Sequence, residues 1–195
     1  VLPPSIDLFR ANCAALPPRF LKALHDAKEE PTPVNTHVKI NGLKNPNFLV
    51  IIGCATSGVL DAVRGLHKNI DFICVVEPNV GRFKATMMRE YVVKYLQGRS
   101  VEFVIGSKPD TLINDLYQVF SATDPQFGTL CVRSYAPEVI YDPFAYPPGK
   151  NGEVHPDVKS ITETVAGASK LVFTAMGCAS DTHYRWERMW QNRLN

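Results

Sequence analysis

The sequence predicts an α/β fold: a mostly parallel sheet of roughly five to seven strands, with helices on both faces and a helical arm at the N-terminus. Apolar runs of strand length alternate four times with helical patterns, and the connections between them are short. Strands joined through helices in this way become parallel neighbours with right-handed crossovers. We expect the helical arm over residues 1–34 and a single α/β domain over residues 35–195.

The first predicted strand and the residues after it define the sheet. Residues 48–52 are an unbroken apolar run, as in a strand buried on both faces. A turn of small residues follows over Gly53–Gly58, and a helical pattern covers residues 59–66. A second apolar strand over residues 71–76 ends on Glu77. Strand, small-residue turn, helix, strand and acid, in this order, are typical of the first unit of a Rossmann-like sheet.

This unit also contains the candidate cofactor site. Backbone N–H groups of a small-residue turn can approach an anion at the start of a helix, and the predicted contacts in the turn are Gly53, Cys54, Ala55 and Gly58. Glu77, nineteen residues after Gly58, can accept hydrogen bonds from two ribose hydroxyls. Ser107 follows the third strand, where many such folds contact the base, although capping a helix is its simpler role.

The ligand of this site stays open. The turn matches neither GxGxxG nor the phosphate loop GxxxxGK[ST], so the motif does not identify the cofactor. S-adenosylmethionine and a nucleotide are the two candidates. The alternative is that the turn only packs the helix on the strand and Glu77 only caps or pairs, since a fold alone does not give a function. No residue can be assigned a catalytic role from the sequence.

The N-terminal arm should contain two short helices. Ser5 can cap the first, Pro17 and Pro18 interrupt it, and the second covers residues 19–28. We expect the arm to pack on the sheet. Residues 36–40 alternate polar and apolar side chains before a turn, and we interpret them as an edge strand or hairpin.

Beyond Glu77 the alternation continues. A helix is expected from about Val80 to Gln97, and a strand over residues 101–105. Pro109 opens the next helix, and a fourth parallel strand is expected over residues 129–132. The buried face of the helix after Pro109 should consist of Leu112, Ile113, Leu116, Val119 and Phe120.

The C-terminal part is less regular. Residues 133–155 are rich in proline and predict an irregular loop whose aromatic side chains line a pocket or cover one edge of the sheet: Tyr135, Tyr141, Phe144 and Tyr146. Asp157 can cap a helix over residues 158–166. Residues 171–176 fit a late strand or a buried helix, and a last helix is expected over residues 182–194.

Composition limits the class of protein. The net charge of +2 over 195 residues gives no reason to expect nucleic acid or an anionic membrane as a partner. No apolar run reaches membrane-spanning length. The five cysteines are scattered with no CxxC pair, which indicates reduced thiols in a cytoplasmic protein and no metal site. Trp186 and Trp190, one helical turn apart, would permit a homo-oligomer.

Five stretches carry a resemblance to a known family: ANCAALPPRFLKAL, FLVIIGCATSGVLDAV, VVEPNVGRFKATM, VEFVIGS and GCASDTHYRWERMWQNRLN. Together they resemble the N-terminal domain of the motility-associated factor (Maf) family of flagellin glycosyltransferases. The resemblance implies a Rossmann-like or methyltransferase-like domain followed by a separate sugar-transferase domain. It implies an accessory or recognition module for protein glycosylation with a vestigial cofactor site. Its partner would be the downstream transferase domain or a protein substrate.

Two other functions use the same crevice. A class I S-adenosylmethionine-dependent methyltransferase of small molecules would contact the amino-acid end of the cofactor through the Gly turn, the ribose through Glu77 and the adenine near Ser107. Methyl transfer needs little beyond in-line placement, so the absence of an obvious catalytic pair is compatible with it. Ile51, however, stands where most such enzymes carry an acid. A nucleotide-sugar or dinucleotide binder is the further alternative.

Overall fold

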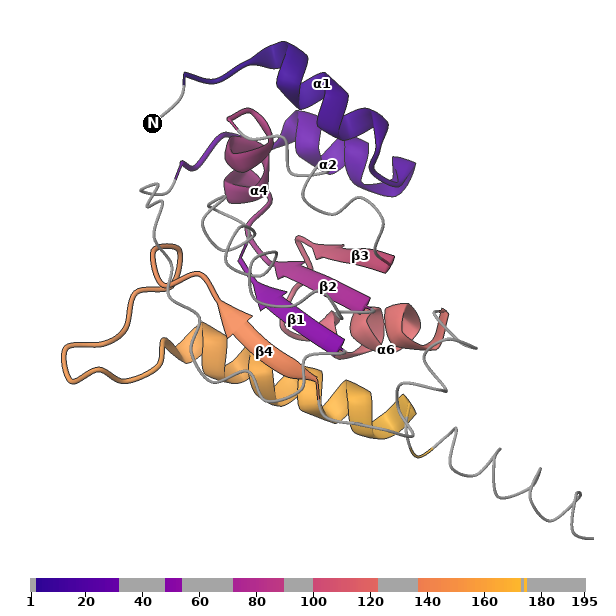
Figure 1. Cartoon of the computed structure of the whole chain (residues 1–195), viewed down its shortest axis with the longest axis vertical. Helices are drawn as coiled ribbons and strands as arrows, with labels where there is room; N and C mark the ends of the chain where they lie inside the picture. The colour runs from indigo at the N-terminus through magenta and orange to yellow at the C-terminus, as the bar shows by residue number, and fades with distance from the viewer. Residues whose placement is uncertain are drawn as a thin grey trace, which may run out of the picture.

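The computed structural model describes residues 3–31, 48–53, 72–89, 100–122, 137–172 and 174, and these form a sheet between two helical layers (Figure 1). The strands are β1 (Phe48–Ile52), β2 (Phe72–Glu77), β3 (Ser100–Ile105) and β4 (Glu138–Tyr141). They lie in the order β3-β2-β1-β4, and every neighbouring pair is parallel. The predicted α/β class with a parallel sheet is therefore confirmed, with four strands in the described part of the chain.

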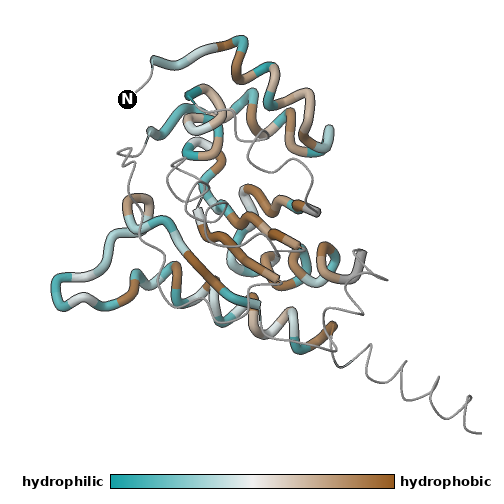
Figure 2. Tube along the Cα trace, viewed as in Figure 1, coloured by the Kyte–Doolittle hydropathy of each residue, from teal (hydrophilic) through white to brown (hydrophobic). Residues whose placement is uncertain are grey.

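The strand order reverses beside β1. The chain runs from β1 outward through β2 to β3, and then returns to β4 on the other side of β1. Every residue of β1 and β2 is buried, as the unbroken apolar runs predicted. β2 includes Glu77 as its last residue. The two central strands therefore carry the core of the protein, which Figure 2 shows as hydrophobic segments at the centre of the molecule.

Alternate residues of the strands point into two separate hydrophobic cores, one on each face of the sheet. Phe48, Val50 and Ile52 of β1 face one core, and Leu49 and Ile51 face the other. The first core is completed by α6 (Leu112–Ala122) and by a helix over residues 156–172. The second is completed by α1 (Ile6–Ala14), α2 (Leu21–Asp26) and α4 (Val80–Met87). These two groups of helices lie on opposite sides of the sheet (Figure 1).

The N-terminal arm forms as expected and packs on the sheet. The Ser5 hydroxyl caps α1 by accepting a hydrogen bond of 3.3 Å from the Leu8 N–H. Pro18 begins a short 3₁₀ turn, η1 (Pro18–Phe20), so the expected second helix divides into η1 and α2. Phe9 and Leu24 are fully covered in the same core as Leu49, which joins the arm to the sheet.

α4 is shorter than predicted. It was expected to run to about Gln97 but ends at Met87, where side chains and the arm bind carbonyls that a longer helix would bond within itself; residues 90–97 lie outside the described residues. The Asn12 side-chain amide donates to the Met87 carbonyl at 2.8 Å, and the Ser5 N–H donates to the Met88 carbonyl at 2.7 Å. The Arg89 guanidinium donates to the Ala85 carbonyl at 2.8 Å.

The prediction of an irregular loop over residues 133–155 is wrong for part of that range, because β4 lies within it. Pro137 and Pro143 flank the strand rather than interrupt it, so neither removes an N–H that the ladder needs. The strand is only half-buried apart from Ile140. The apolar pattern of β4 is therefore weaker in the sequence than the unbroken apolar runs of β1 and β2.

The next helix begins earlier and ends later than predicted. It covers residues 156–172, with proline at its first position, where a missing N–H costs nothing. His155, not Asp157, caps it: the His155 Nδ1 accepts from the Asp157 N–H at 3.2 Å and its carbonyl accepts from the Lys159 N–H at 3.0 Å. Leu171 and Val172 are helical, so the strand interpretation fails for them.

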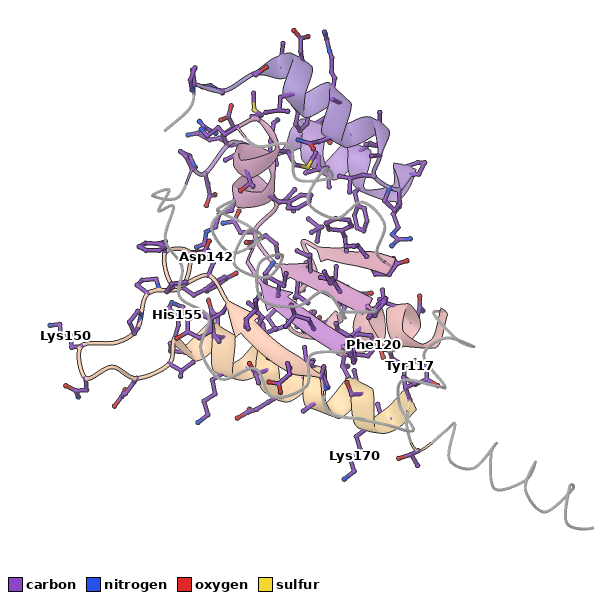
Figure 3. All side chains as sticks on the ribbon, in the orientation of Figure 1. Tyr117, Phe120, Asp142, Lys150, His155 and Lys170 are labelled. Atoms are coloured by element: carbon purple, nitrogen blue, oxygen red, sulfur yellow. The ribbon has the colours of Figure 1, made fainter. Side chains whose placement is uncertain are left out.

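α6 carries the predicted face. Leu112, Leu116 and Phe120 are buried, and Ile113 and Val119 pack beside them. Phe120 is fully buried and its ring meets that of Phe48 in β1 edge-on at 5.1 Å, while Tyr117 on the same helix is 37% exposed; Figure 3 labels both side chains. The helix begins at Leu112 rather than at Pro109, which lies in the turn before it.

Other predictions lie outside the described residues. They are the boundary at residue 34, the strands at 36–40 and 129–132, the helices at 59–66 and 182–194 with Trp186 and Trp190, and Tyr135. In the part of the chain that is described, no helix combines the length and the apolar character needed to cross a membrane.

Replacing Phe9 with alanine tests whether the arm belongs to the cooperative unit. Phe9 is 2% exposed, and its loss should lower the free energy of unfolding by about 3–5 kcal/mol. Ile6→Ala in the same helix is the control, because Ile6 is 53% exposed and its loss should change stability by at most about 0.5 kcal/mol. Urea unfolding measures both. Equal stabilities of the two variants would mean that the arm is not part of the folded core.

Candidate functional site

The candidate site lies at the C-terminal edge of the sheet, where the strand order reverses. Gly53 directly follows β1, and Asp142 directly follows β4, so these residues stand on the two sides of the reversal. Glu77 ends β2 next to them. Open parallel sheets bind ligands in the crevice outside this edge, which makes it the place to look for function.

Glu77 is fully buried and hydrogen-bonded within the chain. Its Oε1 accepts from the Asn79 N–H at 2.8 Å and from the Tyr146 hydroxyl at 3.2 Å. Asn79 in turn caps α4, since its side-chain oxygen accepts from the Arg82 N–H at 3.0 Å. The acid at the end of β2 is therefore tied both to the start of α4 and to a residue beyond β4.

Asp142 places Tyr146 opposite Glu77. The Asp142 N–H donates to the Ile52 carbonyl at 3.0 Å, which extends the β1–β4 ladder by one step. Its Oδ1 accepts from the Phe144 N–H at 2.8 Å, an Asx-type turn, and its carbonyl accepts from the Tyr146 N–H at 3.0 Å. Figure 3 shows Asp142 at the end of β4. The turn brings the chain back over the sheet edge, and the Tyr146 ring follows.

The Tyr146 ring fills the space above Gly53. Tyr146 is 3% exposed, and a Cβ at Gly53 would lie 3.1 Å from the Tyr146 Cε2 and 3.3 Å from the Asp142 Cβ. Gly53 also has a φ of +84°, which side chains rarely adopt. The Arg82 guanidinium lies 5.0 Å from the centre of the Tyr146 ring, and the His155 ring meets it edge-on at 5.5 Å.

The electrostatics keep the Tyr146 hydroxyl protonated. Burial raises its pKa well above the ordinary value, the charge of Glu77 and the hydrogen bond to it raise it further, and Arg82 opposes them. Such a hydroxyl donates a hydrogen bond but is a poor general base or nucleophile, because those roles need a pKa near the working pH. The arrangement is suited to holding Glu77, not to transferring a proton.

The structure brings two of the predicted site residues together and directs a third away from them. Gly53 and Glu77 lie together, and both contact Tyr146. Ser107 is directed elsewhere: its hydroxyl donates to the Asp115 Oδ2 at 2.7 Å, and both line a hollow beside β3. Cys54, Ala55 and Gly58 lie outside the described residues.

Tyr146 and Asp142 were missed as partners of Glu77. Tyr146 was among the aromatic residues predicted to line a pocket, but it lies 69 positions from Glu77 and no spacing rule connects them. The available signal for the turn was Asp142 itself, because an Asp side chain often accepts a hydrogen bond from the backbone N–H two residues later.

Other reactive groups in the described ranges give no second site. No cluster of three or more His, Cys, Asp or Glu side chains suited to a metal ion occurs among them. Cys13 and Cys74 are reduced and buried, and burial raises the pKa of both thiols, which makes them inert.

Comparison of the chain with protein-family models, curated proteins and solved structures gave no match.

Tyr146→Phe should make the protein less sensitive to alkaline pH. The folded pKa of Tyr146 lies above its unfolded value of about 10, so the stabilisation is complete below pH 10 and declines as pH rises above it. Between pH 9 and 11 the free energy of unfolding of the variant should therefore fall by about 1 kcal/mol less than that of the wild type. Urea unfolding at both pH values measures the difference. Parallel losses would show that Tyr146 titrates normally.

Gly53→Ala should destabilise the protein more than Gly152→Ala does. Both glycines have positive φ, +84° and +76°, so both substitutions carry the same backbone strain. Nothing lies within 4 Å of a Cβ at Gly152, whereas one at Gly53 presses on Tyr146. In urea unfolding, Gly53→Ala should lower the free energy of unfolding by about 1 kcal/mol more than Gly152→Ala does. Equal losses would mean that Tyr146 does not pack on Gly53.

Proposed function

We propose that this chain is a Rossmann-like recognition module of a Maf-type protein glycosylation enzyme and is not itself catalytic. The strand order β3-β2-β1-β4 with an acid ending β2 supports the Rossmann-like assignment, since doubly wound sheets reverse direction beside their first strand. The buried reduced thiols of Cys13 and Cys74 support a cytoplasmic location.

The contact between Tyr146 and Glu77 carries the proposal. A ribose at this crevice would compete for the Glu77 carboxyl, whose Oε1 already accepts from Asn79 and Tyr146. Displacing Tyr146 would cost a hydrogen bond to a charged group, about 1.5–3 kcal/mol, before its buried ring is counted. That cost alone lowers affinity about tenfold to a hundredfold. A crevice filled by its own side chains is what a vestigial cofactor site would contain.

The principal alternative is a class I methyltransferase acting on a small molecule. Gly53 and Glu77 lie at neighbouring strand ends beside the reversal, where such a cofactor would bind. In that case Tyr146 would swing away from Glu77 as S-adenosylmethionine enters. A nucleotide-sugar or dinucleotide binder would need the same movement, and Arg82 beside Tyr146 would then offer a charge for phosphate.

Isothermal titration of the folded chain separates these functions. We expect no micromolar binding of S-adenosylmethionine, S-adenosylhomocysteine or UDP-N-acetylglucosamine, because each ligand would first have to displace the Tyr146 hydroxyl from the Glu77 carboxyl. Glu77→Gln is the matched variant, since it keeps the size of the side chain and removes its charge.

Micromolar binding of S-adenosylmethionine that is lost in Glu77→Gln would contradict the recognition module and favour the methyltransferase. The same pattern with UDP-N-acetylglucosamine would favour the nucleotide-sugar binder. Circular dichroism of each sample confirms that a silent titration comes from folded protein.

A further inference from the structure

The outer edge of β3 borders a hollow. β3 is the last strand on its side of the described sheet (Figure 1). A hollow of about 420 Å³ beside it is lined by four consecutive strand residues, 102–105, with side chains from η1 and α6. Successive residues of a strand point to opposite faces of the sheet. A hollow that touches all four therefore runs along the edge of the strand and not over one face.

Backbone groups of β3 face this hollow. The Gly106 N–H donates to the Glu77 carbonyl at 2.9 Å, which fixes the phase of the parallel ladder between β3 and β2. Residues two apart repeat the same orientation, so residues 102 and 104 bond toward β2. Phe103 and Ile105 consequently direct their N–H and C=O groups outward, and both line the hollow.

The walls of the hollow come from both helical layers. Phe103 and Ile105 belong to the core beneath the arm, and Val104 belongs to the core of α6. Phe20 of η1 and Val119 of α6 close the two sides. An extended chain placed along β3 would thus find an apolar wall above and below it for its alternating side chains.

The charges of the hollow favour a basic partner. Glu102 and Asp115 provide two carboxyl groups and Arg19 one guanidinium. Arg19 and Glu102 meet at 3.9 Å, with side chains 58% and 38% exposed. An ion pair this long and this exposed contributes little stability and opens readily.

We propose that the outer edge of β3 binds an extended peptide with basic side chains, which adds to the sheet as a further strand. The backbone groups of Phe103 and Ile105 would supply the pairing, and Glu102 and Asp115 the preference for lysine or arginine. That this peptide is a segment of the protein to be glycosylated rests on the proposed function. The strand addition itself rests only on the edge of β3.

Fluorescence polarisation with a defined probe tests the proposal. The probe is the fluorescein-labelled heptapeptide Thr-Lys-Val-Lys-Val-Lys-Thr. Its control is the same peptide with alternate backbone nitrogens methylated, which keeps the charge but removes the donors. We expect the probe to bind and the methylated peptide to bind at least about tenfold more weakly, because two or three backbone hydrogen bonds are lost. Equal affinities, or no binding of either peptide, would overturn strand addition.

Two variants test the charge preference. Glu102→Gln should weaken the lysine probe about two- to fivefold, as expected for an exposed ion pair. Asp26→Asn removes a carboxyl that is even more exposed (67% against 38%) from the Lys22–Asp26 pair of α2, away from the hollow, and should change nothing. Equal weakening by both variants would mean general charge attraction and would overturn the assignment to β3.

Hydrogen exchange locates the bound peptide. In the free chain the amides of Phe103 and Ile105 should exchange faster than those of Cys74 and Val75 in β2, and the probe should slow them. Slow exchange of Phe103 and Ile105 in the free chain would show that the edge is already paired, and would overturn the proposal. This result is independent of the titrations with S-adenosylmethionine, so either proposal can fail without the other.

Discussion

The buried carboxyl group of Glu77 is the constraint on which the rest of the sheet edge depends. A carboxyl with no exposure is costly unless it accepts hydrogen bonds, and Asn79 and Tyr146 both donate to its Oε1. Tyr146 can reach Glu77 only because Asp142 turns the chain immediately after β4. The ring then needs the space that a side chain at residue 53 would take. The residues at the ends of β1, β2 and β4 are thus arranged around one buried acid.

α4 connects this edge to the N-terminal arm. Its first turn holds Asn79 and Arg82 against the site, and its last carbonyls accept from the arm. The Lys84 ammonium reinforces the connection by donating to the His25 and Ala27 carbonyls at 2.9 and 2.8 Å. The arm is therefore a structural part of the folded core. A partner bound along β3 would touch Arg19 of this arm, and so would lie on the same rigid framework as Glu77.

The sequence predicted those features that depend on local pattern. Unbroken apolar runs identified β1 and β2, the position of Glu77 followed from the second run, and helical spacing gave the buried face of α6. Features set by distant contacts were missed. α4 ends early because Asn12, 75 positions away, binds its last carbonyl, and β4 was hidden by the prolines that flank it. The partnership of Tyr146 with Glu77 is likewise a contact across the fold, which no local pattern records.

A double-mutant cycle between Glu77 and Tyr146 tests the central claim most directly. Urea unfolding at pH 7 of the wild type, Glu77→Gln, Tyr146→Phe and the double variant gives the coupling energy between the two side chains. The hydrogen bond at 3.2 Å predicts a coupling of about 1 kcal/mol or more. If the losses in free energy of unfolding of the two single variants sum to that of the double variant within about 0.5 kcal/mol, the two side chains act independently. The Tyr146 hydroxyl would then not hold the Glu77 carboxyl, and the crevice would be open to a ligand.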